Sequence, residues 1–238
     1  MPTHTIEQGE CLFSLAAQYG IPCKDLHDHP QNAALKKKRP HAGILAPGDI
    51  VFIPPRKTKS ESVATDSRHK FVVTLPKVKL RLVMRDRQGK PYGGKKFIVT
   101  VDGKETKGST TGSGLIEVDI PATARKGRLQ VWFSEDPDDP APHVDRELEL
   151  GHLDPVDTLS GVQARLNNLG YRCSDDGHAD LATVGAVRAF RAKVGLPEVE
   201  EPEPPPDGDE RAHVAATLAK LLDDDVRQKL ASQHEGEA

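Results

Sequence analysis

The apolar residues near the start of the chain predict a helix followed by a second, shorter one. They recur at the i, i+3, i+4 and i+7 spacing of a single helical face: Leu12, Leu15, Ala16 and Tyr19. Gly20 is placed to end this helix, and after Pro22 a second short helix is expected to begin at Leu26. Residues 3–7 and 50–53 predict two strands that pair antiparallel and cover the helices. This first region is therefore expected to fold as a βααβ unit.

The middle of the chain has the period-two pattern of β-strands. Its alternating segments cover residues 71–75, 78–84, 97–101, 115–120, 129–133 and 147–150. Turn signals such as Gly93-Gly94 and Asp102-Gly103 separate these segments. Several short strands at this spacing predict an antiparallel β-sandwich. We expect Trp132 in its core; stacking of the Trp132 ring on a sugar is the alternative.

Helical spacing returns in the last part of the chain and predicts a bundle of three helices. We expect Asp157 to cap the first helix, which ends at Gly170, and Thr183 to cap the second. Asp209 is placed to open the third. A proline-rich acidic insert at 198–208 separates the second and third helices, and its prolines favour an extended and mobile segment.

These patterns predict a multidomain α+β protein. Its segments are a first unit at 1–55, a linker at 56–70, a sandwich at 71–150, a helical domain at 151–222 and a charged tail at 223–238 that is expected to fray. No apolar run reaches the ~18 residues of a transmembrane helix, so no membrane span is expected. The first residues lack the basic and apolar regions of a secretory signal. We therefore expect synthesis in the cytoplasm, with action in the cell envelope or export by a secretion machine.

Charge is distributed unevenly along the 238 residues. Residues 1–56 carry a net charge of +1, residues 57–134 carry +10 and residues 135–238 carry −14. A basic middle and an acidic end indicate electrostatic matching to a partner, or to each other. Nucleic acid is the rival partner for the basic middle. Few aromatic residues are interleaved with its lysines and arginines, which alternate as on a solvated strand face, so we expect no nucleic-acid binding.

The first region also resembles a known family. Its order of strand, Gly turn, two helices, Pro-Gly turn and strand resembles a LysM module, on the segments Thr5-Ile6-Glu7-Gln8-Gly9-Glu10-Cys11-Leu12 and Leu45-Ala46-Pro47-Gly48-Asp49-Ile50-Val51-Phe52. The resemblance implies binding of the N-acetylated glycan of peptidoglycan or chitin between two loops. It implies contacts from Gly9, Glu10, Cys11, Leu12 and Phe13, and from Gly43, Ile44 and Leu45. Backbone groups would bond the acetamide and apolar side chains would cover its methyl group; a LysM fold that only docks protein is the alternative.

A longer segment inside this region resembles one particular group of LysM proteins. The residues His29-Pro30-Gln31-Asn32-Ala33-Ala34-Leu35-Lys36-Lys37-Lys38-Arg39 resemble a segment of LysM proteins associated with type VI secretion and related contractile injection systems. This implies a secretion-system spike or an effector protein as a partner. The cationic run is alternatively a solvated helix end, because cations suit the negative end of the helix dipole.

The last region resembles the three-helix peptidoglycan-binding domain of bacterial wall hydrolases. The resemblance is carried by the segments Val162-Gln163, Arg165-Leu166-Asn167, Leu169-Gly170-Tyr171, Asp176-Gly177 and Ala186-Val187-Arg188-Ala189-Phe190-Arg191. It implies glycan contacts from Tyr171, Asp176, Gly177 and Asp180. The aromatic-Gly-Pro that usually follows Asp-Gly is replaced by His178-Ala179-Asp180-Leu181. The turns of the predicted sandwich resemble carboxypeptidase-regulatory-like or transthyretin-like domains, which implies a spacer or a protein-binding platform.

Catalytic and metal-binding candidates are few. Cys11 precedes a helix, where the dipole can lower a thiol pKa, but no ordered Cys–His–polar triad accompanies it. The candidate metal ligands are His27, Asp28, His29 and His41. We expect no enzyme activity, no metal and no cofactor. Three cysteines are too few for a disulfide framework, so Cys11, Cys23 and Cys173 are expected to be thiols, with a Cys11–Cys23 bridge as the alternative.

Together these patterns favour a non-catalytic adaptor that binds peptidoglycan and holds a secretion device or an effector at the wall. Two weak sites on one chain gain ~10²–10⁴ in avidity when both can reach the glycan. One alternative is a structural or effector-loading component of a contractile injection apparatus that binds no sugar. The other is the targeting subunit of a wall hydrolase.

Overall fold

The computed structural model describes residues 2–57, 62, 65–70, 76–86, 88–133, 144–206 and 208–235. They contain α-helices and antiparallel sheets, so the predicted mixed α+β class is confirmed at that level. The chain divides into two compact units. The first comprises Met1–Val78, Asp119–Arg125 and Glu149–His152, and the second comprises Lys79–Val118, Lys126–Leu148 and Leu153–Ala238.

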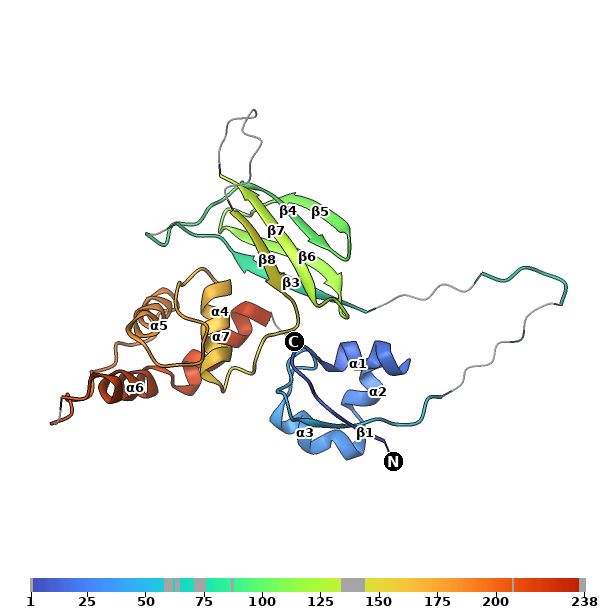
Figure 1. Ribbon diagram of the computed structural model, residues 1–238, viewed down its shortest axis with the longest axis horizontal. Helices are drawn as coiled ribbons and strands as arrows, with labels where there is room; N and C mark the ends of the chain where they lie inside the picture. The colour runs from blue at the N-terminus through green and yellow to red at the C-terminus, as the bar shows by residue number, and fades with distance from the viewer. Residues whose placement is uncertain are drawn as a thin grey trace. The chain divides into compact units, whose positions relative to one another are not determined.

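The first unit starts with a short strand that pairs with one formed some 45 residues later. Strand β1 (Thr3–Thr5) runs antiparallel to β2 (Ile50–Phe52), with His4 opposite Val51. Between them lie α1 (Leu12–Tyr19), α2 (Cys23–His27), the 3-10 helix η1 (Pro30–Asn32) and α3 (Ala33–Lys38), drawn in blue in Figure 1. The predicted strand pair and two helices are present, although the strands are shorter than predicted and η1 was not expected. Helix α3 ends at Lys38, within the cationic run that was alternatively interpreted as a solvated helix end.

Local sequence explains where the first two helices end and begin. Gly20 takes the left-handed conformation, with φ 63° and ψ 37°, and α1 ends there as predicted. Helix α2 begins at Cys23, directly after Pro22, so the predicted start at Leu26 is wrong. Leu26 lies inside α2 and is its fully buried residue.

The core of the first unit takes its buried residues from α1, α2, β2 and the loops beside them. Its buried residues are Ile6, Leu12, Leu15, Ala16, Ile21, Leu26, Leu45, Val51 and Ile53. Polar side chains are also buried beside this core, among them Asn32, Arg39 and Asp49. Asn32 donates to the carbonyls of Leu26 and Phe52 and accepts from the Phe52 N–H, at 2.8, 3.0 and 2.8 Å. Asp49 pairs with Arg39 at 3.0 Å. The Asn32 bonds fasten η1 to the end of α2 and to β2, and the Arg39–Asp49 pair joins the end of α3 to the residue before β2.

Among the described residues in the middle of the chain, six strands form two sheets. The larger sheet has the order β5-β4-β7-β8, and the smaller one consists of β3 and β6 (Figure 1). The strands are β3 (Lys77–Val83), β4 (Lys96–Val101), β5 (Lys104–Ser109), β6 (Leu115–Pro121), β7 (Lys126–Trp132) and β8 (Val144–Glu149). Alternate residues are buried, namely Phe97, Val99, Val101, Ile116, Val118, Ile120, Leu129 and Val131. This is the period-two pattern expected of half-buried strands; the strand predicted at 71–75 lies outside the described residues.

Two features of the larger sheet differ from the prediction. Strand β5 was missed because its sequence is polar throughout and carries no alternation; it lies at the sheet edge, where it pairs with β4. Trp132 was predicted to lie in the core, but it is only half-buried. Leu129 and Val131 are the buried residues of β7, and successive side chains of a strand point to opposite faces, so Trp132 lies on the other face.

The second unit also contains α4 (Leu159–Asn168), α5 (Leu181–Lys193), α6 (Glu210–Leu221) and α7 (Asp224–Glu235), yellow to red in Figure 1. Two predicted caps are shifted. Thr158, and not Asp157, caps α4. Thr183 was predicted to cap α5. The cap is instead Asp180, whose carboxylate accepts from the Thr183 N–H at 2.7 Å. Asp209 caps α6 as predicted.

Residues 224–235 form a helix and not the fraying tail that was expected. Val226 and Leu230 of α7 are fully buried in the core that α4, α5 and α6 also line. Asp223 starts the helix by accepting from the Val226 N–H at 2.9 Å. The proline-rich insert was expected to be mobile, but Val199 packs against this core and Glu201 pairs with Arg188. Within residues 151–206 and 208–235, the helical part therefore has four helices, and the insert contacts the rest of this part at two points.

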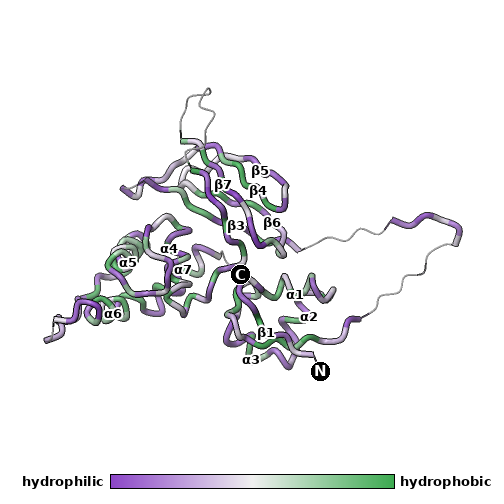
Figure 2. Tube along the Cα trace, viewed as in Figure 1, coloured by the Kyte–Doolittle hydropathy of each residue, from purple (hydrophilic) through white to green (hydrophobic). Residues whose placement is uncertain are grey.

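Hydrophobic and hydrophilic residues alternate closely along the chain (Figure 2). Within the described ranges, no helix combines the length and the apolar character that crossing a membrane requires.

Candidate functional site

The structure brings together the two loops of the first unit that were predicted to contact a ligand. Leu12 opens α1, and its N–H donates to the carbonyl of Ala42 at 2.9 Å. The loop around Ala42 is itself a turn, closed by a bond from the Ile44 N–H to the His41 carbonyl at 3.1 Å. Residues 9–13 and 43–45 therefore lie side by side, although some 30 residues separate them along the chain.

The side chains of Leu12, Ile44 and Leu45 in these loops face the core and not the solvent, whereas Phe13 is partly exposed. Leu12 is 2% exposed and Leu45 is 5% exposed, and both belong to the core of the first unit. Ile44 and Cys11 are also buried. The resemblance implied that apolar side chains would cover the methyl group of a sugar. In the structure Leu12, Ile44 and Leu45 instead hold the two loops in place.

Gly9 and Glu10 are engaged within the first unit. A Cβ atom on Gly9 would lie 2.9 Å from Arg125 Nη1 and 3.2 Å from His152 Nε2, so these two side chains cover the glycine. Glu10 accepts from the Glu7 N–H at 2.9 Å and contacts His4 Nε2 at 2.6 Å. Burial acts to raise the pKa of Glu10, but these two partners outweigh it and the pKa is lowered. The Glu10 carboxylate is thus held ionised as an anchor of its loop.

Cys11 has a structural position at the start of α1. Its N–H donates to the Ser14 hydroxyl at 3.0 Å, and that hydroxyl donates back to the Cys11 carbonyl at 2.9 Å. All three cysteines are thiols in the structure. Burial raises the pKa of Cys23 to about 11 and that of Cys173 to about 12. Both groups are therefore protonated at neutral pH and are weak nucleophiles.

The candidate metal ligands serve other contacts. His29 caps η1 by accepting from the Gln31 N–H at 3.2 Å, and its ring lies 4.7 Å from that of Phe52. Asp28 pairs with Lys36 at 2.7 Å. Across the part of the chain that the structure describes, no three His, Cys, Asp or Glu side chains are grouped so that they could hold a metal ion.

Two predicted residues of the loops remain at the surface, and a third residue joins them. Phe13 and Gly43 are partly exposed, as is His41. A Cβ atom on Gly43 would lie 3.2 Å from the His41 ring and 3.6 Å from the Phe13 ring. The Gly43 N–H donates to His41 Nδ1 at 3.2 Å. His41 was considered only as a metal ligand, because nothing in the sequence indicates that its ring turns toward Gly43.

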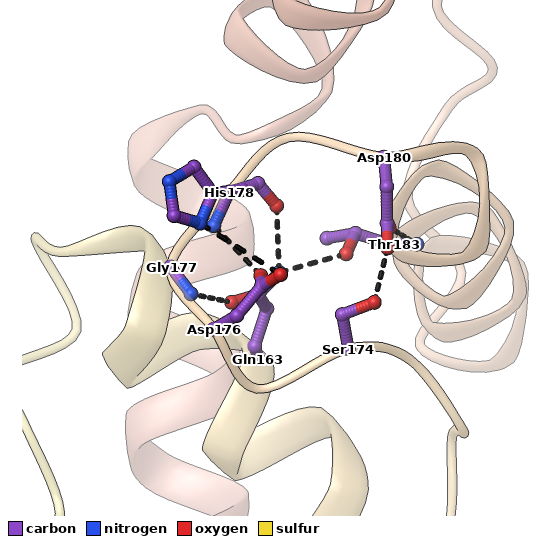
Figure 3. A network of polar contacts seen from close by, with 7 residues as sticks. All are labelled: Gln163, Ser174, Asp176, Gly177, His178, Asp180 and Thr183. Atoms are coloured by element: carbon purple, nitrogen blue, oxygen red, sulfur yellow. Dashed lines mark hydrogen bonds and ion pairs between the residues drawn. The ribbon is translucent and has the colours of Figure 1, made fainter.

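The second predicted site is a hydrogen-bonded turn organised by a buried glutamine (Figure 3). Gln163 is fully buried; its Nε2 donates to the His178 carbonyl at 2.9 Å and to the Thr183 hydroxyl at 3.0 Å. Its Oε1 accepts from the Gly177 N–H at 2.8 Å. Asp176 accepts from the His178 N–H at 2.9 Å. The Asp176-Gly177 turn is therefore shaped by α4 and by the start of α5.

Asp180 and Tyr171, also predicted to contact glycan, have partners inside the second unit. Asp180 caps α5 and accepts from the Ser174 hydroxyl, and these bonds lower its pKa. Tyr171 is half-buried and meets the Phe190 ring edge-on, with centroids 5.7 Å apart. The Arg85 guanidinium lies 5.4 Å from the centre of the Tyr171 ring.

Arg85 is a residue that the sequence did not single out. Its Nε donates to the Leu169 carbonyl at 3.1 Å, which satisfies an end carbonyl of α4, and its Nη1 donates to the Gly89 carbonyl at 3.1 Å. One face of Tyr171 is thus covered by a side chain that follows strand β3. Comparisons of the chain with known protein families, with curated proteins and with solved structures found no match.

Proposed function

We propose that this protein is a non-catalytic adaptor that docks at the bacterial cell wall by binding N-acetylated glycan with its first unit. The observation that carries the proposal is the hydrogen bond from the Leu12 N–H to the Ala42 carbonyl. It joins the two loops between which a LysM module holds its sugar. The order of β1, two helices, a further helical segment and β2 supports the same family resemblance.

The second part of the proposal concerns the protein partner. The segment that resembles secretion-associated LysM proteins contains His29 and Asn32, and both have folding roles, as a cap and as a buried bridge. Its lysines follow on α3, where Lys36 and Lys37 are exposed. We propose that this segment identifies a spike or an effector of a contractile injection system as the partner of the adaptor.

We further propose that the sheets form a β-sandwich spacer and that the helical part is a variant of the peptidoglycan-binding domain. A second candidate function is favoured by the contacts of this helical part. Asp176, Gly177 and Asp180 are engaged in bonds of the fold, and Arg85 covers Tyr171. Because these residues already have partners within the fold, they favour a structural or effector-loading component of an injection apparatus over a protein with a second sugar-binding site.

Retention of the full-length chain on purified peptidoglycan sacculi tests the proposal. We expect the protein to sediment with the sacculi and to be released by soluble N-acetylglucosamine oligomers. Cleavage of the glycan strands by lysozyme should also release it. A chain that stays in the supernatant, or that is not displaced by the oligomers, would refute glycan docking. A zone of clearing in a zymogram on the same sacculi would show instead that the protein cuts the wall.

A further inference from the structure

Strand β5 lies at one edge of the four-stranded sheet of the second unit. The sheet has the order β5-β4-β7-β8, so β5 has a neighbouring strand on one side only (Figure 1). Five of its six residues are exposed, and the sixth, Thr106, is half-buried. Within the described residues, no strand and no backbone hydrogen bond joins its outer side. An edge of this kind offers its N–H and C=O groups to a further strand.

The turn between β4 and β5 determines which backbone groups of β5 are bonded to β4. Asp102 and Gly103 have positive φ angles of 48° and 74°, as in the two-residue type I′ turn of a hairpin. The strand residues on either side of this turn are Val101 and Lys104, which lie opposite each other. They form a hydrogen-bonded pair, and from there hydrogen-bonded and non-hydrogen-bonded pairs alternate along the two strands.

The odd-numbered residues of β5 therefore point their backbone groups away from β4. These residues are Glu105, Lys107 and Ser109. The residue after the strand follows the same alternation, because the N–H of Thr110, an even-numbered residue, donates to the Lys95 carbonyl at 2.9 Å. The outer side of β5 thus presents the N–H and C=O groups of three residues.

The charges of β5 are complementary to those of a second, antiparallel β5. Glu105 and Lys107 lie on the same face of the sheet, with Oε2 of the first 3.3 Å from Nζ of the second. When two copies pair about a two-fold axis through Thr106, Glu105 of each copy lies opposite Lys107 of the other. An axis through either charged residue would put like charges opposite each other, which is destabilising. Lysine on an edge strand discourages most partners, so this charge pattern favours a second β5 in one register.

The backbone is compatible with the same register. Glu105 and Lys107 both point their N–H and C=O groups outward, so each Glu105–Lys107 pair between the copies exchanges two hydrogen bonds, and the two pairs make four. Thr106 lies opposite Thr106 of the other copy, as a non-hydrogen-bonded pair of β-branched side chains. Lys104 lies opposite Gly108, which has no side chain to obstruct it. The register therefore satisfies both the charges and the backbone.

We propose that two copies of this protein join edge to edge through β5, so that their two four-stranded sheets become one sheet of eight strands. The interface is isologous, because the same strand supplies both halves of it. It is also small, so the expected dissociation constant of the dimer is on the order of 100 μM. Dimerisation does not depend on glycan binding, but a dimer with two copies of the first unit would add avidity to such binding.

Sedimentation equilibrium of the full-length chain over about 5–500 μM tests for this dimer. The wild type should change from monomer to dimer within that range. Lys107→Glu puts glutamates opposite each other and should raise the dissociation constant at least about tenfold. Glu105→Lys should do the same, and the double exchange Glu105→Lys with Lys107→Glu should restore the dimer. Lys104→Glu is the matched control, since it changes the charge equally but lies opposite a glycine; it should change the dissociation constant by less than about twofold.

Lys107→Pro tests the backbone pairing separately from the charges. Because the Lys107 N–H points outward, proline there removes a hydrogen bond of the dimer and none between β4 and β5. We expect it to abolish the dimer and to leave thermal unfolding of the monomer almost unchanged. A wild type that stays monomeric at every concentration would refute the proposal. So would a dimer that Lys107→Glu and Lys107→Pro leave intact, or one that the double exchange does not restore.

Discussion

Replacing Asn32 should destabilise the first unit more than any other exchange of one small polar residue there. The Asn32 side chain is 3% exposed and makes three hydrogen bonds to backbone groups. Two of them reach the N–H and the carbonyl of Phe52, and the third reaches the carbonyl of Leu26. One amide thus ties the end of α2 and the 3-10 helix η1 to strand β2.

The expected cost follows from these contacts. Each hydrogen bond is worth about 1 kcal/mol net, so Asn32→Ala should lower the free energy of unfolding of the first unit by about 3 kcal/mol. A unit of ~90 residues is stable by about 4–13 kcal/mol, so this loss is a substantial share of the total. Asn32→Asp keeps the shape and the bond from the Phe52 N–H, but it loses two donors and buries a negative charge. We expect it to be at least as harmful at neutral pH and less harmful in acid, where the carboxyl regains a donor.

Amide hydrogen exchange read by mass spectrometry is the suitable assay. Trp132, the one tryptophan of the chain, lies in β7 of the second unit, so tryptophan fluorescence does not report on the first. Peptides from residues 2–57 report on it directly. A loss of 3 kcal/mol should speed exchange of the core amides of α1 and β2 about 150-fold, provided that these amides exchange through opening of the unit.

Gln31→Ala is the control, because Gln31 is adjacent and exposed. It should change the exchange rates of the same peptides by less than about twofold, as for a surface substitution. The reasoning would be refuted if Asn32→Ala speeded exchange by less than about fivefold, which corresponds to the loss of only 1 kcal/mol. Equal effects of the two variants would also refute it.

Three further predictions concern the helical core, acid stability and thiol reactivity. Leu230→Ala should lower the stability of the second unit by about 2–5 kcal/mol in thermal unfolding, because Leu230 is fully buried, whereas the neighbouring exposed Gln228→Ala should have almost no effect. Burial opposes ionisation of Asp49, yet the Ala46 N–H, Lys38 and Arg39 lower its pKa below the usual value. Its stabilising contribution is therefore present at neutral pH and is lost as the pH falls below about 4, and Asp49→Asn should flatten this loss in unfolding curves recorded from pH 7 to 2.5. Cys23 and Cys173, with pKa values of about 11 and 12, should be alkylated by iodoacetamide at pH 8 at least about 100-fold more slowly in the native than in the unfolded chain, and equal rates would contradict their burial.

The LysM resemblance implied the position of the candidate site, but not the roles that its side chains have in the structure. The Gly and Pro residues that bracket α1 and β2 are part of that resemblance. Whether Leu12 and Leu45 would cover a ligand or a core could not be read from their apolar character, because both roles require it. His41 was considered only as a metal ligand, because the direction of its ring cannot be predicted from its neighbours in sequence, and only the bond from the Gly43 N–H shows that the ring turns toward Gly43.

Some features that were not predicted have a recognisable pattern in the sequence, and others do not. Helix α7 could have been found, because Asp223, Val226 and Leu230 have the spacing of a cap and a buried face. The contact of Arg85 with Tyr171 had no such signal, since 86 positions separate them and neither residue belongs to a periodic pattern. Strand β5 had none either, because an edge strand with both faces exposed carries no alternation.

Local order along the chain was enough to specify the α+β class, the antiparallel pairing of β1 with β2 and the end of α1 at Gly20. Backbone preferences and hydrophobic spacing act over a few residues, so they can be read directly from neighbours. Tertiary packing alone decided which polar groups are buried and by what they are satisfied. Asn32 forms hydrogen bonds with Phe52, which is 20 positions away in the sequence, and Gln163 forms one with Thr183, which is also 20 positions away. A buried amide needs hydrogen-bond partners, and the tertiary fold determines which groups are close enough to serve. The spacing of residues along the chain does not indicate which groups these are.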